Sequence, residues 1–342
     1  MSKNYYIIPV FVPHEGCPHN CVFCNQDRIT GIKDQVTAQT VRDTITSYLE
    51  TIQNKNAVIE VSFFGGTFTG IREEKQKELL AVAKEYKENG FVDKIRLSTR
   101  PDYINDYILT YLQEYGVDII ELGVQSLDDE VLRKSGRGHS VSDVIYASSL
   151  IKRYGFILGH QIMPGLPGDT FDKDITTTKA SIEMKPDICR IYPSLVIKDT
   201  PMEQMYERLE YVPYSLEDAV NISKVIYNMY RSNGINVIRI GLQPTESINE
   251  GKDIIAGPFH PSFRELVEGS LLIDIILENL KDEDMAIVNI NPKDLSKLYA
   301  NKKVYFNKLK ESNKIVTVAQ DEKVQRGHIK LCLKGKELDI IY

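Results

Sequence analysis

The chain has 342 residues, of which 42% are hydrophobic and 26% charged, and its formal net charge is −6 at pH 7. This composition is ordinary for a globular protein with one large and one smaller domain; it gives no overall nucleic-acid signature, and no run approaches the ~18 consecutive apolar residues of a membrane span. Five cysteines, three of them clustered, favour a reducing compartment and a metal over a disulfide framework. Because the first residues also lack the layout of a signal peptide, we expect a cytoplasmic protein with no membrane partner.

Apolar, strand-like runs alternate with helical periods over the first two thirds of the chain. The predicted strands are residues 7–12, 57–64, 95–98, 117–124, 156–163, 188–195 and 235–240. The predicted helices between them are residues 41–52, 79–88, 107–115, 144–154, 170–184 and 215–233. Strands that alternate with helices through short loops indicate parallel βαβ units. The sequence therefore predicts an α/β fold that closes as a barrel or partial barrel, with its chemistry at the carboxyl ends of the strands.

The last third of the chain has a different pattern. Residues 241–263 contain three prolines and several glycines and are expected to be irregular, and residues 267–280 form an apolar helical period. The final part is predicted to contain strands at 286–290, 314–318 and 328–333 and a helix at 293–309. We therefore predict a core domain at 1–245, a covering segment and helix at 246–284, and a small α/β appendage at 285–342.

Three cysteines, Cys17, Cys21 and Cys24, follow the first predicted strand. Thiolates are the usual ligands of iron–sulfur clusters, and three on one loop can hold three irons of a 4Fe–4S cluster while the fourth stays open to a small molecule. With an aromatic residue before the third cysteine, this loop resembles that of the radical S-adenosylmethionine (SAM) superfamily. The alternative is a structural zinc site, which normally has four Cys or His ligands; His14 and His19 are close enough to complete it. A disulfide would leave one cysteine unpaired.

Small and polar residues follow several other predicted strands. Gly65, Gly66 and Thr67 end the second strand, where glycines let the backbone approach a ligand closely. These residues resemble the glycine-rich motif of radical SAM enzymes, whose backbone is expected to contact the SAM amino group. Ser98 ends the third strand, at a position expected to meet the SAM ribose.

Further polar residues are expected around the same ligand. Arg100 has the bidentate fork that suits the SAM carboxylate; the alternative is a surface ion pair. Gln125 suits a hydrogen bond to SAM, and the rigid turn that begins at Met163 could hold the adenine ring. His139 is a candidate acid–base group because its pKa is normally near neutral, or else a capping or structural residue. No catalytic residue is assigned.

Six motifs together resemble the catalytic-subunit family of Elongator. They are residues 17–24, 65–68, 98–103, 121–126, 137–140 and 163–167, in the order that this family shows. The resemblance implies a radical SAM enzyme that modifies RNA, either tRNA or rRNA, after reductive cleavage of SAM at a 4Fe–4S cluster to a 5′-deoxyadenosyl radical. It also implies an electron donor such as flavodoxin or ferredoxin.

The chain departs from the Elongator pattern in three respects. Asn25 and Gln26 replace the Pro-Gly-Gly that follows the third cysteine, and Ser98 replaces a glutamate. The last 60 or so residues also show no loop for acyl-CoA, so we expect no acetyltransferase domain. One alternative is an enzyme similar to oxygen-independent coproporphyrinogen oxidase, although that family usually carries a fourth cysteine where Asn25 and Gln26 stand. Another, from a different class, is a non-catalytic RNA-binding protein that contains zinc.

The appendage is the expected RNA contact. From residue 281 to the end, 13 Lys and Arg stand against 9 Asp and Glu, a local charge of +4, and Tyr305, Phe306 and His328 are interleaved with the lysines. Cations beside aromatics suit unpaired bases; the alternative is an ordinary surface with the aromatics in the core. Cys189, in a predicted strand, and Cys332, in the appendage, are expected to be dispensable.

Overall fold

The computed structural model describes residues 4–12, 19, 21–25, 36–244, 249, 252–281 and 283–342. The chain groups into two compact units, a larger one of Met1–Ser215 with Ile226–Phe259 and a smaller one of Leu216–Val225 with His260–Tyr342. The apolar helix expected in a covering segment thus groups with the C-terminal residues. Within the described residues, no helix is both long and apolar enough to cross a membrane.

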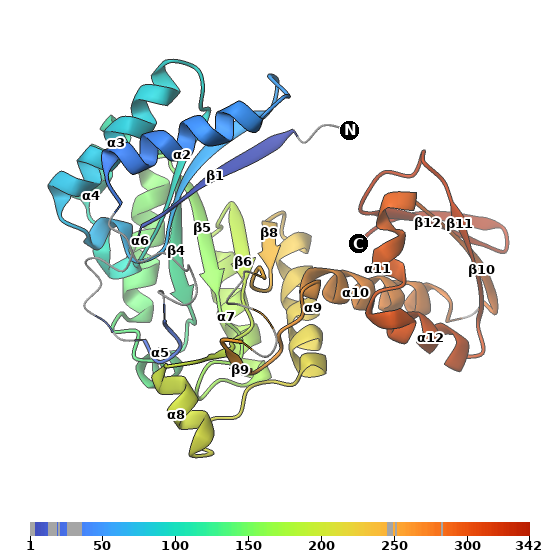
Figure 1. The fold of residues 1–342 in the computed structure, drawn as a ribbon. Helices are drawn as coiled ribbons and strands as arrows, with labels where there is room; N and C mark the ends of the chain where they lie inside the picture. Colours follow the sequence, from blue (N-terminus) through green and yellow to red (C-terminus); the bar gives the residue numbers. More distant parts are fainter. Residues whose placement is uncertain are drawn as a thin grey trace. The chain divides into compact units, whose positions relative to one another are not determined.

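A seven-stranded parallel sheet forms the larger unit, in the order β1-β2-β3-β4-β5-β6-β8 (Figure 1). Its strands are β1 (Tyr5–Phe11), β2 (Val58–Phe64), β3 (Lys94–Thr99), β4 (Ile119–Gln125), β5 (Ile157–Ile162), β6 (Ile188–Ile191) and β8 (Asn236–Ile240). The order of the strands in the sheet follows their order along the chain, so each crossover leads to the adjacent position in the sheet. The sheet curls into an open partial barrel with β1 and β8 at its edges, which confirms the predicted α/β fold.

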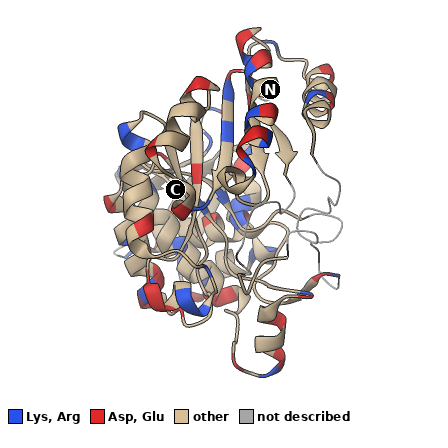
Figure 2. Cartoon of the chain, turned by 90° about the vertical axis from the view of Figure 1, so that its left-hand side faces the viewer, with Lys and Arg blue, Asp and Glu red and all other residues tan. Residues whose placement is uncertain are grey.

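Helices connect these strands and pack on one face of the sheet, for example α3 on β3 and α6 on β4 and β5. They are α2 (Ala38–Thr51), α3 (Glu73–Glu88), α4 (Asp106–Glu114), α5 (Asp129–Lys134), α6 (Val141–Arg153), α7 (Phe171–Glu183), α8 (Pro201–Glu207) and α9 (Leu216–Ser232). Side-chain caps fix several starts: Thr37 and Ser140 each form a capping box with the residue three positions later. Acidic and basic residues are interspersed on the helices seen in Figure 2.

The strands alternate between an apolar face and a polar face. In β3, Ile95 and Leu97 are fully buried and alternate with Arg96 and Ser98. Because successive side chains of a strand point to opposite faces, the apolar residues meet the helices and the polar residues point into the partial barrel. Burial of one such aliphatic side chain contributes about 1.5–3 kcal/mol to the stability of the fold. Packing of the apolar face therefore fixes each strand, and with it the direction in which its polar side chains point.

Two short segments lie outside this alternation. The strands β7 (Val196–Ile197) and β9 (Ile254–Ala256) pair antiparallel in a separate sheet. The second lies in the stretch 241–263, which was expected to be irregular, so that prediction is wrong at this point.

The smaller unit contains a four-stranded sheet in the order β11-β10-β12-β13. Its elements are α10 (Phe263–Asn279), β10 (Met285–Ile290), α11 (Leu295–Leu298), α12 (Val304–Glu311), β11 (Ile315–Gln320), β12 (His328–Leu333) and β13 (Lys336–Ile341). The prediction of one helix over 293–309 is wrong, because Asn301, Lys302 and Lys303 have positive φ and break it. The strand β13 was not predicted.

Candidate functional site

The described part of the cysteine loop is held by backbone hydrogen bonds from two distant segments. The Val22 amide donates to the Ser135 carbonyl at 3.0 Å, and the Met202 amide donates to the Val22 carbonyl at 2.9 Å. Cys21 is buried and Cys24 is half-buried, and the Cys24 amide donates to the Cys21 carbonyl at 3.0 Å. Cys17 lies outside the described residues. Two of the three predicted ligands therefore lie in one tight turn.

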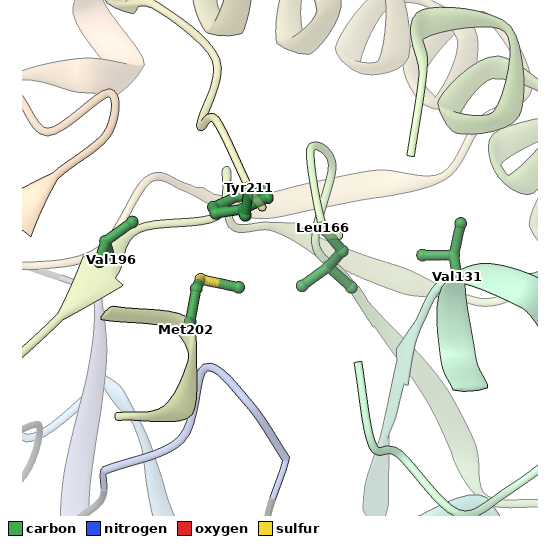
Figure 3. Close-up of a cluster of buried hydrophobic side chains, with 5 residues drawn as sticks. All are labelled: Val131, Leu166, Val196, Met202 and Tyr211. Atoms are coloured by element: carbon green, nitrogen blue, oxygen red, sulfur yellow. The ribbon is translucent and has the colours of Figure 1, made fainter. Parts of the chain in front are cut away.

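A cluster of buried apolar side chains packs against this turn (Figure 3). Its buried members are Val131, Leu166, Val196, Met202 and Tyr211. Val22 and Phe23, which stand between the two described cysteines, pack against this cluster. The Val-Phe pair thus anchors the loop by packing against the buried cluster.

Arg137 is the polar residue in direct contact with the loop. Its guanidinium donates from Nη1 to Cys21 Sγ at 3.4 Å and from Nη2 to the Gly123 carbonyl at 2.6 Å. It is only 6% exposed, and its Nε has no hydrogen-bond partner in the structure. Arg137 belongs to one of the six motifs, but no role was predicted for it, because a lone arginine in a turn carries no signal for this contact.

Gly65 is required by the close approach of two strands. A Cβ at this position would lie 2.3 Å from the Val12 carbonyl oxygen, and the φ of Gly65 is +91°. The Val12 amide also donates to the Phe64 carbonyl at 2.7 Å. The backbone of the first strand alone therefore explains this glycine, without any ligand. Gly66 has a φ of +20°, and Thr67 is 2% exposed.

Arg100 is buried rather than at the surface. It binds Asp102 in bidentate fashion, with Nε–Oδ1 and Nη2–Oδ2 distances of 2.9 Å, and Nη2 also donates to the Arg137 carbonyl. Its side chain is 3% exposed and its Nη1 has no hydrogen-bond partner. The alternative of a surface ion pair is thus wrong about its location, because the pair with Asp102 is largely buried, and Nη1 of the guanidinium is left without a partner.

Gln125 and Met163 meet at the carboxyl ends of β4 and β5. The Met163 amide donates to the Gln125 carbonyl at 2.8 Å, where the register of the two strands shifts. Gln125 has a φ of +66°, an uncommon value for a residue other than glycine. Its Oε1 is buried without a hydrogen-bond partner, while Met163 is half-buried against the cluster of Figure 3. A strained backbone and an orphaned amide at one residue are typical of a ligand contact.

His139 is buried between two arginines and does not cap a helix. Ser140 is the N-cap of α6, and neither nitrogen of the His139 ring has a hydrogen-bond partner. Burial, with the charges of Arg137 and Arg100, lowers the pKa of His139 to about 3. The imidazole is therefore neutral at physiological pH, which argues against the acid–base role considered for it.

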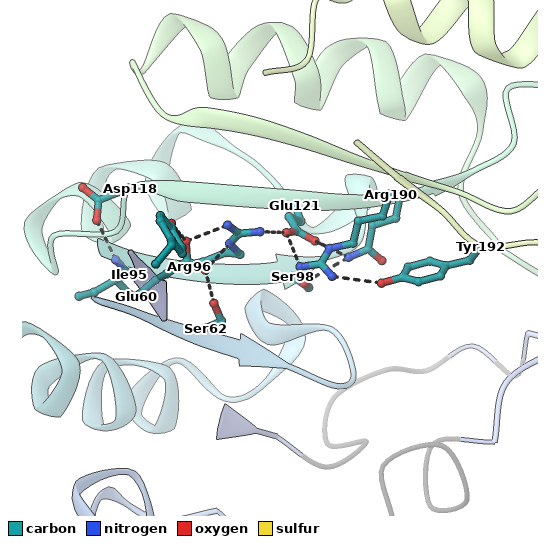
Figure 4. A network of polar contacts seen from close by, with 11 residues as sticks. Glu60, Ser62, Ile95, Arg96, Ser98, Asp118, Glu121, Arg190 and Tyr192 are labelled. Atoms are coloured by element: carbon teal, nitrogen blue, oxygen red, sulfur yellow. Dashed lines mark hydrogen bonds and ion pairs between the residues drawn. The ribbon is translucent and has the colours of Figure 1, made fainter. Parts of the chain in front are cut away.

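A chain of ion pairs crosses the inner face of the sheet (Figure 4). Arg96 on β3 contacts Glu60 on β2, with Nη2–Oε2 at 2.7 Å, and Glu121 on β4. Glu121 in turn accepts from Arg190 on β6 and from Gln161 on β5, whose Nε2 lies 2.7 Å from Oε2. This chain of ion pairs was not predicted, although acidic and basic residues in otherwise apolar strands were a usable signal.

Ser98 belongs to the same inner face. Its Oγ accepts from Gln161 Nε2 at 3.4 Å. The structure therefore groups Cys21, Arg100 and Gln125 with Arg137, and links Ser98 to the chain of ion pairs.

The residues around Cys21 fit a polar ligand. Three buried polar atoms of residues that lie around Arg137 have no hydrogen-bond partner: Arg100 Nη1, Gln125 Oε1 and Arg137 Nε. Orphaned buried groups are costly and rare in proteins unless a ligand or water satisfies them. Among the residues that the structure describes, no group of three or more His, Cys, Asp or Glu side chains is placed to hold a metal, and Cys17 is not among these residues.

Two family models match the chain over most of its length. The model described as "Radical SAM superfamily" matches residues 11–179, and the one described as "Radical_SAM C-terminal domain" matches residues 186–272. The chain belongs to the radical SAM superfamily. It is a radical SAM enzyme, and members of this superfamily use SAM and a 4Fe–4S cluster.

Curated relatives confirm the resemblance to the Elongator family. The chain is 28% identical over 255 residues to the tRNA uridine(34) acetyltransferase of Methanocaldococcus infernus, covering 63% of this chain and 48% of the relative. It is 28% identical over 266 residues to Elongator complex protein 3 of Bos taurus, covering 65% and 48%. An uncharacterised protein of Methanocaldococcus jannaschii is 34% identical over 221 residues, covering 61% and 67%. The chain thus spans about half the length of the two named enzymes.

Solved structures share this radical SAM fold. Elp3 of Methanocaldococcus infernus with an N-terminal deletion matches with a TM-score of 0.64 at 22% identity, covering 97% of this chain and 74% of that one. SuiB of Streptococcus suis bound to SAM matches with a TM-score of 0.51 at 16% identity, covering 69% and 50%.

Proposed function

We propose that this radical SAM enzyme holds a 4Fe–4S cluster on Cys17, Cys21 and Cys24, binds SAM at the carboxyl edge of its sheet, and modifies RNA. One observation carries the proposal. Buried polar atoms of Arg100 and Gln125 stand without partners in the network that includes Cys21. A ligand with both donors and acceptors satisfies them, and SAM has both.

The remaining assignments are part of the same proposal. The Arg100 guanidinium has a free Nη1 for the SAM carboxylate, and the Gln125 amide oxygen can accept from a donor group of SAM. Gly66 and Thr67 supply backbone groups after β2, Ser98 faces the ribose, and the turn at Met163 flanks the adenine. When reduced by a donor such as flavodoxin or ferredoxin, the bound cluster supplies the electron that cleaves SAM to methionine and a 5′-deoxyadenosyl radical.

Cofactor chemistry can be tested on the purified protein. After anaerobic reconstitution with iron and sulfide, dithionite and SAM should release 5′-deoxyadenosine, measured by mass spectrometry. We expect Gly66→Val to retain the cluster and lose this product, because a β-branched side chain enters the space of the ligand. A protein that takes up zinc and no iron under these conditions would contradict the proposal and favour the structural zinc site.

An RNA substrate is supported by the names of the curated relatives and by the local charge of +4 in the C-terminal residues. Lys302, Lys303, Lys308 and Lys310 are all exposed around α12. Tyr305 is buried and Phe306 packs edge-on against Tyr299, with ring centroids 5.0 Å apart. We therefore assign these two aromatics to the interior of the smaller unit and the RNA contact to the lysines.

Two measurements test the RNA substrate. Mass spectrometry of nucleosides from tRNA and rRNA, with and without the gene, should reveal one modified nucleoside that is missing without it. Binding of labelled tRNA should weaken steeply with salt, and alanine at the four lysines around α12 should reduce that salt dependence. Alanine at Lys55 and Lys179, exposed lysines of the larger unit, is the matched control. If no nucleoside is missing, the substrate is a small molecule or a protein.

A further inference from the structure

The SAM contacts proposed above do not use Arg137, whose side chain is only 6% exposed beside the cysteine loop. Its side chain connects the loop to β4, through Cys21 Sγ at 3.4 Å and the Gly123 carbonyl at 2.6 Å. No acidic side chain pairs with Arg137 in the contacts described for it. Its positive charge is therefore directed at a sulfur atom and a carbonyl dipole.

The backbone around Arg137 also holds the cysteine loop in place. The Ser135 carbonyl accepts from the Val22 amide at 3.0 Å, and the Arg137 carbonyl accepts from Arg100 Nη2. Gly138, with a φ of +75°, lies against the His19 ring, where a Cβ would come within 2.3 Å. These contacts fix the backbone of residues 135–138 beside the loop. The guanidinium itself is held by its hydrogen bonds to Cys21 Sγ and to the Gly123 carbonyl.

We propose that Arg137 is a positioning residue that fixes the Cys21 thiolate and raises the reduction potential of the cluster. This inference rests on the proposed function, because it requires Cys21 to be a cluster ligand. A cation that donates to a ligand sulfur stabilises the additional negative charge of the reduced cluster, and hydrogen bonds to sulfur are among the factors that set cluster potentials. The second contact, to Gly123, requires the planar fork of arginine, which lysine lacks.

The test compares Arg137→Met with the matched surface variant Arg133→Met, since Arg133 is exposed on α5 four residues earlier. After anaerobic reconstitution, the midpoint potential of the cluster is measured by a redox titration followed by electron paramagnetic resonance, and iron is counted per chain. For Arg137→Met we expect the equilibrium for reduction to be about tenfold less favourable, which is about 59 mV for a one-electron couple. Arg133→Met should match the wild-type protein in both readouts.

A second variant, Arg137→Lys, separates charge from geometry. It keeps the cation, so its potential should stay close to that of the wild-type protein, while loss of the bridge to Gly123 should lower the iron bound per chain. If Arg137→Met does not fold, Arg137→Lys alone decides: full iron content at an unchanged potential would overturn the bridging role.

The experiment distinguishes an error in the role of Arg137 from an error in the proposed function. A folded Arg137→Met protein with wild-type potential and iron content would overturn the role of Arg137 and leave the cluster assignment intact. A wild-type protein that takes up no iron would overturn the proposed function before any variant is compared.

Discussion

The Glu121 carboxylate on β4 accepts two hydrogen bonds from the Arg190 guanidinium on β6, Nε–Oε2 at 2.8 Å and Nη2–Oε1 at 3.1 Å. The pair reaches across the intervening strand β5 because Gly159 stands there. A Cβ at Gly159 would lie 2.7 Å from Glu121 Cγ. A glycine in the middle of a strand, normally unfavourable, thus leaves the space in which the buried ion pair forms.

We first predict that Glu121→Gln destabilises the protein strongly. The change leaves Arg96 and Arg190 buried with one carboxylate fewer, and breaking a buried ion pair costs about 3–5 kcal/mol. Urea unfolding of the cluster-free protein measures the loss. Glu85→Gln, which removes an exposed partner of Arg42, is the control and should have a much smaller effect. Equal effects of the two variants would show that the inner ion pairs contribute no more than a surface pair.

The second prediction concerns Gly65. Gly65→Ala combines a strained positive φ with a clash against the Val12 carbonyl oxygen. The strained backbone alone should lower the free energy of unfolding by about 1–3 kcal/mol, and the clash should lower it further. Gly90→Ala is the control, since Gly90 has a φ of +75° and no atom within 4 Å of the added Cβ. Thermal unfolding of both variants isolates the clash. A Gly65→Ala protein as stable as Gly90→Ala would contradict the close approach of β1 and β2.

Cysteine variants should separate cluster ligands from structural thiols. Cys21→Ala and Cys24→Ala are expected to lose the reconstituted cluster, seen as loss of bound iron and of its visible absorption. Cys189→Ala and Cys332→Ala should retain both the iron and the absorption. Cys189 is buried in β6, and burial raises the pKa of its thiol, which disfavours the thiolate that binds metal. Cys332 lies on β12 of the smaller unit. Retention of iron by Cys21→Ala would remove Cys21 from the ligand set.

A fourth prediction distinguishes a ligand contact of Arg100 from a purely structural one. Arg100→Met should weaken SAM binding about 10- to 100-fold, as expected for the loss of a hydrogen bond to a charged group. Asp102→Asn removes the charge of the partner carboxylate but keeps the guanidinium, so it should bind SAM far better than Arg100→Met. Equilibrium dialysis of the reconstituted proteins gives the two dissociation constants. If both variants lose affinity equally, the pair acts on the fold and Arg100 does not contact SAM.

The last prediction uses Asp174, a buried carboxyl group on α7 that accepts from the Tyr214 hydroxyl at 2.9 Å. Burial and the nearby Asp169 raise the pKa of Asp174 to about 9. The folded protein therefore holds a proton that the unfolded chain releases above pH ~4. The contribution of this group to stability is complete below that pH and is lost as the pH rises towards 9.

Asp174→Asn removes this titration and keeps an oxygen for Tyr214. We expect the melting temperature of the cluster-free variant to exceed that of the wild-type protein at pH 8, with a difference that shrinks towards pH 5. Melting curves from pH 5 to 9 provide the measurement. A variant that is less stable at every pH would mean that the carboxyl group has a role beyond its proton.

The amino-acid sequence by itself determined the seven parallel strands of the larger unit and the edge of the sheet at which polar residues follow them. Strands of period two and helices that end at glycine are set by neighbouring residues, so these strands and six of the helices between them could be predicted, whereas α5, α8, β7 and β9 were not. Because parallel strands end at one edge of a sheet, the residues that follow them could be grouped. Cys21 and Arg100 both contact Arg137, and the side chains of Gln125 and Arg137 both lie against Gly123.

Only the tertiary structure decided which residues touch. Arg137 contacts Cys21 across 116 positions of the chain, and the Glu121–Arg190 pair spans 69. Periodicity tells on which face of an element a side chain lies, but the partner depends on strand order and register and on the space that residues such as Gly159 leave. The break at Lys302 was hidden for the same reason, because three left-handed residues in succession are held by the packing of the smaller unit against their own local preference.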